Sequence, residues 1–99
     1  MKRTARVLLR WLVTDSELPR GKRFSVPARF DHQGDDWTSD AWSLVIEAEE
    51  KPDAKRRQAA TAWFLADEAP KAWLAPGKKF TLFTSKPIAE GLVERVLSD

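Results

Sequence analysis

Apolar residues recur at every second position in several short stretches of the chain. Over residues 3–13 the odd positions from Ala5 to Val13 are apolar, while Arg6 and Arg10 fall on the other face. Period two over this length predicts a half-buried β-strand, because successive side chains of a strand point to opposite faces. The same alternation predicts further strands over residues 23–30, 41–49, 58–65, 79–85 and 92–97.

Two of these segments leave alternatives open. Pro27 has no N–H to give to a ladder, so the strand over residues 23–30 is expected at a sheet edge or bulged at that point. Residues 58–65 are rich in alanine, which also favours a short helix. Thr61, Trp63 and Phe64 favour the strand, because aromatic and β-branched residues pack well on a pleated surface.

Polar segments with glycine or proline separate the strands, at residues 14–22, 31–40, 50–57 and 67–70. Residues 31–40 are expected to form an exposed loop that carries Trp37, and residues 69–74 a single helical turn before Pro76. A further break is expected at Pro87. Six short, regularly spaced strands without a long helical pattern indicate one closed all-β domain over residues 1–99.

The charges are unevenly distributed although the 99 residues carry a net charge of only +2. Residues 1–29 hold eight Lys and Arg against two carboxylates, whereas residues 31–50 hold seven carboxylates and no Lys or Arg. Cross-strand pairing on the outer face explains this asymmetry if the segments are neighbouring strands. The alternative is a polar molecule with a basic face that binds phosphates.

Composition excludes several classes of protein. The chain has no cysteine, which excludes disulfides and thiol chemistry and fits a reducing compartment. The basic start is not followed by a signal-peptide pattern, since Arg10 interrupts the apolar run. No apolar stretch approaches the ~20 residues that cross a bilayer. We therefore expect a cytoplasmic protein that contacts no membrane.

The sequence offers no convincing catalytic or metal site. His32 is the only histidine and is surrounded by carboxylates, but one histidine in a polar loop lacks the spacing of a metal or acid–base site. Glu47 and Glu49 fall on the outward face, with Glu50 next to them, where pairing and solubility explain them. We expect a protein that is not an enzyme and needs no cofactor or metal.

Two kinds of residue are better candidates for binding. Arginine and lysine on one outer face would suit phosphates, and exposed tryptophans would suit stacked bases or a protein interface. Trp11 and Trp42 fall on apolar faces and are expected in the core, and Trp63 is ambiguous. The candidate binding residues are Arg6, Arg10, Arg23, Arg29, Trp37, Trp73, Lys78 and Lys79.

The stretch that begins with Pro76-Gly77-Lys78-Lys79-Phe80-Thr81-Leu82 resembles the C-terminal β-barrel domain of elongation factor Tu and related translation GTPases. Pro87-Ile88-Ala89-Glu90-Gly91 with Val93, and Val26-Pro27-Ala28-Arg29-Phe30 upstream, are similar to phrases of that domain. The likeness extends over most of the chain. It implies a six-stranded antiparallel Greek-key barrel that acts as a stand-alone module.

The departures from that family bear on function. No P-loop pattern is present, and the Arg-Glu-Gly-Gly-Arg phrase of the family's closing region is missing. Part of the family's transfer-RNA contact surface belongs to the regions that differ. We therefore expect a non-enzymatic module that binds a protein partner through loops and edges, with RNA or transfer-RNA binding through a basic face as the alternative. A homodimer is also compatible with exposed edge strands.

Overall fold

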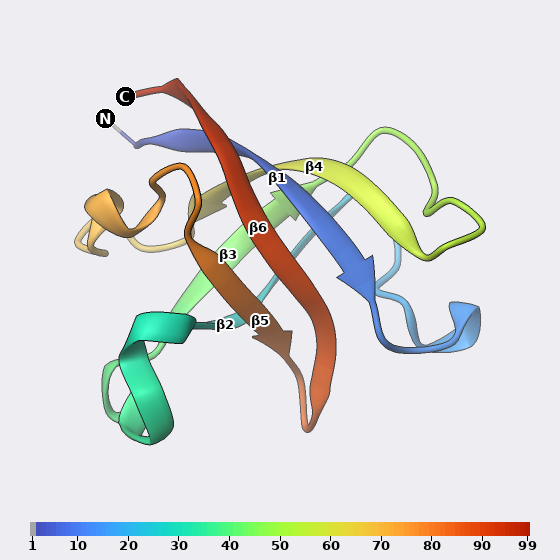
Figure 1. Cartoon of the computed structure of the whole chain (residues 1–99), viewed down its shortest axis with the longest axis horizontal. Helices are drawn as coiled ribbons and strands as arrows, with labels where there is room; N and C mark the ends of the chain where they lie inside the picture. The colour runs from blue at the N-terminus through green and yellow to red at the C-terminus, as the bar shows by residue number, and fades with distance from the viewer. Residues whose placement is uncertain (1) are drawn as a thin grey trace.

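Six antiparallel strands close into a barrel, which confirms the predicted fold class (Figure 1). The computed structural model describes residues 2–99. The strands are β1 (Thr4–Trp11), β2 (Arg23–Phe30), β3 (Trp42–Glu47), β4 (Arg57–Phe64), β5 (Lys79–Phe83) and β6 (Pro87–Ser98). Around the barrel their order is β1-β4-β3-β2-β5-β6, and β6 closes on β1. Since β2, β3 and β4 are consecutive neighbours and β1 lies beside β4, the connectivity is a Greek key.

The strands lie where the alternating pattern predicts them, and the prediction is wrong only about a break at Pro87. Residues 58–65 form a strand and no helix, because β4 pairs with β1 on one side and with β3 on the other. The break expected at Pro87 is wrong, because β6 begins at that residue and runs on to Ser98. Proline is tolerated at the first position of a strand, where its missing N–H leaves no gap in the ladder.

Three short 3₁₀ segments connect the strands: η1 (Asp15–Glu17), η2 (Asp31–Asp40) and η3 (Lys71–Trp73). The predicted helical turn before Pro76 is therefore confirmed as η3. The exposed loop expected over residues 31–40 is exposed but ordered into 3₁₀ turns, with a kink at Gly34, whose φ is 72°. Glycine adopts this left-handed conformation without the clash that a Cβ would cause.

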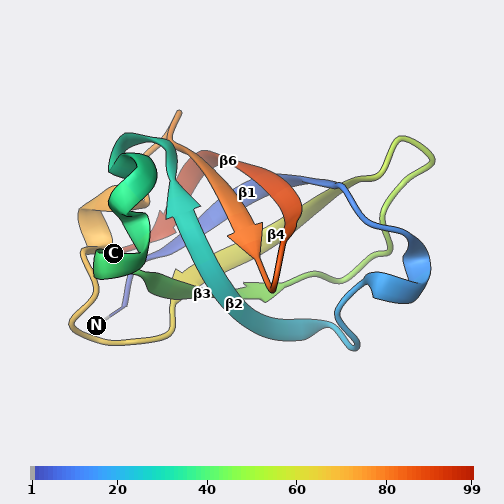
Figure 2. The same ribbon diagram turned by 90° about the horizontal axis from the view of Figure 1, so that it is seen from below.

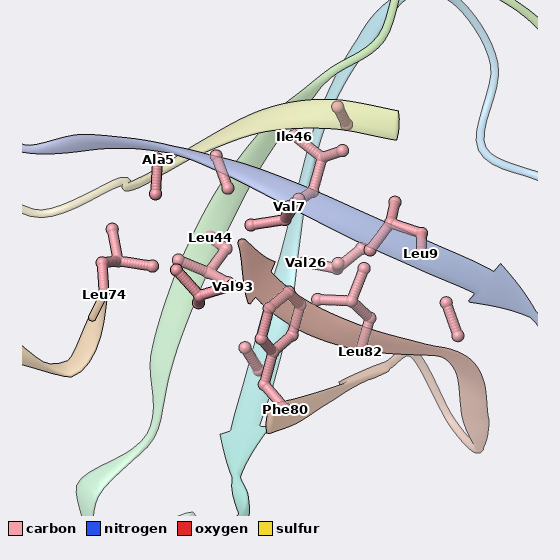
Figure 3. Packing of buried hydrophobic residues seen from close by; sticks show 14 of the residues in the cluster. Ala5, Val7, Leu9, Val26, Leu44, Ile46, Leu74, Phe80, Leu82 and Val93 are labelled. Carbon is pink, nitrogen blue, oxygen red and sulfur yellow. The ribbon is translucent and has the colours of Figure 1, made fainter. Parts of the chain in front are cut away.

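Inward side chains from all six strands fill the barrel (Figure 3). Trp11 is 4% exposed, as expected for a core residue, whereas Trp42 is only partly buried and its Nε1 donates to Asp40. Gly91 is essential to this packing, because an added Cβ would lie 2.2 Å from Cζ of the Phe80 ring. The glycine in β6 thus makes the space that the phenylalanine of β5 occupies.

Pro27 lies where β2 has a neighbour on one side only. On one side β3 is in register with Arg23 to Ala28, but on the other side β5 is in register only with Ala28 to Phe30. The barrel therefore has a local edge along the N-terminal half of β2, although the sheet as a whole is closed. The prediction of an edge position for Pro27 is confirmed at this local level.

Candidate binding surface

An aromatic and cationic cluster lies on the outer face of β2 and β5. Arg29 is opposite Thr81 of β5, and its guanidinium carbon lies 5.7 Å from the centre of the Phe83 ring. Trp37 from η2 stacks on the same ring, with centroids 4.8 Å apart and planes inclined by 28°. All three side chains remain partly accessible to solvent. We call Arg29, Trp37 and Phe83 the aromatic–arginine cluster.

Gln33 holds the loop that carries Trp37 in place. Its Oε1 accepts the backbone N–H of Phe30 at 2.8 Å, and its Nε2 donates to the carbonyl of Asp40 at 2.9 Å. One side chain therefore links the two ends of η2, and Ser39 adds a bond to the Asp36 carbonyl at 2.7 Å. These bonds fix the segment that positions Trp37. Figure 1 shows η2 at the end of β2. Such pre-ordering reduces the entropy that binding would cost.

Arg29 differs from the other candidate arginines in its electrostatic surroundings. Arg10 pairs with Glu90, Arg23 with Glu47 at 2.6 Å, and Arg6 with Glu94 at 3.9 Å. Within residues 2–99 no carboxylate forms an ion pair with Arg29, whose recorded partner is the Phe83 ring. The cross-strand pairing expected between the basic segment 1–29 and the acidic segment 31–50 is thus confirmed for Arg23, whereas Arg6 and Arg10 pair with carboxylates of β6. Arg29 retains a charge that a ligand can neutralise.

The basic residues do not form the single face that the RNA hypothesis requires. Arg6 and Arg10 lie on β1, whereas Arg23 and Arg29 lie on β2. Two strands separate β1 from β2 in either direction around the barrel, so the two pairs lie on strands that are not neighbours. Sequence alternation places residues on the inside or the outside, but strand order decides which outer faces coincide.

The remaining candidates have other surroundings. Trp73 is half-buried, with its ring 4.5 Å from that of His32 and 5.5 Å from that of Phe30, and it packs against the core. Lys79 is exposed at the start of β5, and the carbonyl of Lys78 accepts the N–H of Val93 at 2.8 Å. None of these three belongs to the aromatic–arginine cluster.

Trp63, which the sequence left ambiguous, faces outward on β4. Two cations cover its ring: Nζ of Lys2 lies 4.2 Å from the ring centroid and the guanidinium carbon of Arg23 lies 5.3 Å from it. The side chain is only 9% exposed as a result. It is therefore less accessible to a partner than Trp37.

Two surface depressions of the described chain contain no catalytic or metal-binding group. A shallow groove of about 590 Å³ crosses the outer face of β1, β6 and β5, where Leu8 and Leu92 are flanked by Arg10 and Glu90. A second depression, of about 550 Å³, lies at the barrel end beside Trp11. Neither contains a nucleophile with an adjacent base, and the described residues include no group of three potential metal ligands.

Three carboxylates, two in turns and one at the C-terminus, have lowered pKa values. A hydrogen bond from Lys86 lowers the pKa of Glu17, the backbone N–H of Arg57 lowers that of Asp53, and a hydrogen bond from Arg3 lowers that of Asp99. All three shifts favour the charged form and serve local structure. None of these carboxylates belongs to the aromatic–arginine cluster.

Sequence reasoning found Arg29 and Trp37 but missed Phe83 and Gln33. Alternation placed Phe83 on the outer face of its strand, which was a usable signal, because a large exposed aromatic residue is informative in a soluble domain. No local pattern identified Gln33, since its two partners lie at opposite ends of η2.

Comparison with known proteins adds no family to this description. No helix in the described part of the chain is long and apolar enough to cross a membrane. No protein-family model, curated protein or solved structure matches the chain.

Proposed function

We propose that this chain is a non-enzymatic binding module that contacts a protein partner through the aromatic–arginine cluster. The observation that carries the proposal is the meeting of an arginine without an ion-pair partner and a partly exposed tryptophan on one phenylalanine ring. Tryptophan and arginine are the residues that most often dominate protein interfaces. Because Gln33 pre-orders the loop, the cluster presents a defined shape before binding.

The resemblance to the barrel of elongation factor Tu supports a role connected with translation in the cytoplasm. A six-stranded antiparallel barrel is compatible with that family. The Pro76-Gly77 turn precedes β5, and Gly77 has a φ of 88°.

Charge around the cluster favours a protein partner over RNA. The adjacent η2 segment contains Asp31, Asp35, Asp36 and Asp40, and none of them forms an ion pair within the described residues. Four carboxylates beside one free arginine repel a phosphate backbone. A protein surface with mixed charges meets no such penalty.

The test is affinity capture with three versions of the purified protein as bait: wild type, Trp37→Ala and Arg10→Ala. Arg10 is the matched control because it is an exposed arginine on β1, outside the aromatic–arginine cluster, and is already paired with Glu90. We expect a protein partner that wild type and Arg10→Ala retain and that Trp37→Ala loses. Capture that is equal for all three baits contradicts the proposal.

RNA binding is the other outcome of the same test. Labelled transfer RNA and a generic RNA are titrated into the protein at two salt concentrations, with tryptophan fluorescence as the signal. Saturable binding that weakens steeply with salt and is lost in Arg29→Ala would replace the protein partner with RNA. No binding of RNA at micromolar protein agrees with the proposal.

A further inference from the structure

Two leucines that lie side by side on β1 and β6 form an apolar surface on the outside of the barrel. Leu8 of β1 is 39% exposed, and Leu92 of β6 is directly opposite it and half-buried. Both line the groove of about 590 Å³ described above, and none of the residues that line it belongs to the aromatic–arginine cluster. Figure 1 shows β1 and β6 side by side toward the viewer, whereas in Figure 2 β2 and β5 lie in front of β1. Exposed apolar surface with a charged rim is typical of a contact site.

Charges of opposite sign flank the two leucines. Two arginines flank the leucine of β1 and two glutamates flank that of β6, namely Arg6 and Arg10 on β1, and Glu90 and Glu94 on β6. Arg10 is directly opposite Glu90 in the ladder. At the other end a bulge in β6 brings Glu94 to 3.9 Å from Arg6. Along the outer face, β1 therefore reads basic, leucine, basic, and β6 reads acidic, leucine, acidic.

A second copy of the chain matches this order in one symmetric arrangement. If a two-fold axis runs between β1 and β6 and parallel to them, β1 of one copy packs over β6 of the other. Leu8 then meets Leu92 of the second copy, and Arg10 meets its Glu90. If the axis instead runs through the leucines and perpendicular to the strands, Arg10 meets Arg6 of the second copy, and like charges repel. The charge order thus selects the first arrangement, which is an isologous two-fold contact.

The leucines would hold such a dimer together, and the charges would set its register. The groove makes this face hollow, so side chains of the second copy can enter it. The side chains of Arg10 and Glu90 are paired within the chain but remain 57% and 53% exposed. A guanidinium has five N–H donors, so it can bind a second carboxylate without losing the first. Complementary charges of this kind contribute more to specificity than to affinity.

We propose that the chain forms a two-fold dimer through the outer face of β1 and β6, with Leu8 of each copy packed against Leu92 of the other. This inference goes beyond the function proposed above and does not depend on it. The contact joins side-chain faces and no strand edges, because β1 and β6 each have a neighbour on both sides in the closed barrel. Each dimer would carry two copies of the aromatic–arginine cluster.

The test is analytical ultracentrifugation of the wild type, Leu8→Glu and Leu65→Glu over a range of concentrations up to millimolar. Leu65 is the matched control, because it is 59% exposed and does not line the groove. The mass of the wild type should rise from that of the 11.3 kDa monomer toward twice that value. Leu8→Glu should weaken the dimer at least tenfold, since its carboxylate would be buried against Leu92, and Leu65→Glu should not. A wild type that stays monomeric, or equal effects of the two variants, overturns the inference.

Charge variants test the two-fold arrangement. Arg6→Glu/Arg10→Glu gives an all-acidic rim, and Glu90→Lys/Glu94→Lys gives an all-basic one. Each variant alone should be monomeric at concentrations where the wild type is a dimer, whereas an equimolar mixture should form a heterodimer. Either variant dimerising alone as the wild type does, or a mixture of folded variants that stays monomeric, contradicts this arrangement.

A milder pair of variants gives the same test if either of those chains fails to fold. Arg10→Glu alone should weaken the dimer, and Arg10→Glu/Glu90→Arg should restore it, because the exchange recovers the pairs within and between copies. Equal dimerisation of these two variants contradicts the arrangement.

A different protein on this face is the other outcome. A monomeric chain that captures a partner, loses it in Leu8→Glu and retains it in Leu65→Glu would assign the face to that partner and overturn the dimer. Loss of the dimer alone leaves the function proposed for the aromatic–arginine cluster unchanged, since that function is tested by Trp37→Ala.

Discussion

The β1–β6 side of the barrel and the β2–β5 side differ in how completely their strands pair and in whether their arginines form ion pairs. On the first, β1 and β6 pair along nearly their whole length, and Arg10 and Arg6 have carboxylates of β6 beside them. On the second, β5 pairs with only three residues of β2, and Arg29 lies against an aromatic ring without an ion pair. On the first side the backbone ladder is complete and Arg10 and Arg6 have carboxylate partners, while Arg95 of β6 forms no ion pair within the described residues. On the second, part of the β2 edge and the guanidinium of Arg29 are left available.

This difference separates residues that stabilise the fold from residues that are free for another role. A satisfied ladder and a paired arginine give a partner little to gain, because existing bonds must be broken first. An open edge, a free guanidinium and a partly exposed indole present unsatisfied groups to solvent. For main-chain and charged groups the β2–β5 side is therefore where a partner would gain most, whereas the exposed leucines Leu8 and Leu97 lie on β1 and β6. Substitutions on the two sides should have different consequences.

The largest effect on stability is expected for Gly91→Ala, beneath the well-paired side. The new Cβ would overlap the buried Phe80 ring, which the closed barrel leaves no room to move. We expect the free energy of unfolding in urea to fall by about 2 kcal/mol, as is typical of overpacking. Phe80→Leu in the same chain should restore part of the loss, since a smaller side chain relieves the clash. Equal losses in the single and double variants would show that Phe80 does not cause the effect.

A smaller effect is expected for Trp37→Ala on the β2–β5 side. The variant loses one stacked aromatic pair on the surface, which is worth about 1 kcal/mol. Its urea transition should remain cooperative while binding of the partner is lost. A loss as large as that of Gly91→Ala would mean that Trp37 is chiefly a structural residue, and the contrast between the two sides would disappear.

A still smaller effect is expected for the Arg10–Glu90 pair. Both side chains are more than half exposed, at 57% and 53%, so solvent and salt screen their attraction. A double-mutant cycle with Arg10→Ala and Glu90→Ala should give a coupling of about 0.5 kcal/mol that decreases at high salt. The corresponding Arg29→Ala variant should show no salt-dependent loss of stability, because no carboxylate pairs with it. A salt-dependent loss in Arg29→Ala would reveal a partner charge in solution.

The smallest effect is expected at Asp53, which organises the β3–β4 connection. Its carboxylate accepts the backbone N–H groups of Arg57 and Lys55, both at 2.9 Å, and its pKa is lowered from the ordinary 3.8. A lowered pKa contributes stability above pH 3.8 that is lost as the pH falls through the folded-state value. Asp53→Asn should therefore lower the thermal midpoint slightly at pH 7 and reduce the loss of stability below pH 4. An unchanged acid profile would contradict this role.

The inside of the barrel was predictable from the sequence to a greater extent than its outside. Alternation alone placed Val7, Leu9, Phe80 and Leu82 on the apolar faces of their strands, and all four are buried. A closed barrel needs one apolar face per strand. It also separated the outward arginines from the core. Local pattern was sufficient wherever burial was the deciding force.

The order of the strands and the Gln33 hydrogen bonds that link the two ends of η2 were not predictable in the same way. Arg6 and Arg29 both alternate outward, yet the Greek key places them on strands that are not neighbours, which depends on pairings between distant segments. The neighbour of Trp37 is Phe83, 46 positions further along the chain, and the clasp by Gln33 depends on a folded loop. A single sequence contains no local signal for such contacts.

The most direct test of the central claim is a selection from a random peptide display library against the wild-type protein. Each selected peptide is then measured against two variants, Arg29→Ala/Trp37→Ala on the β2–β5 side and Arg10→Ala/Leu8→Ala on the β1–β6 side. We predict that most binders weaken at least tenfold with the first variant and are unaffected by the second. Binders that depend on Arg10 and Leu8 and ignore Arg29 and Trp37 would place the binding surface on β1 and β6 and contradict the account.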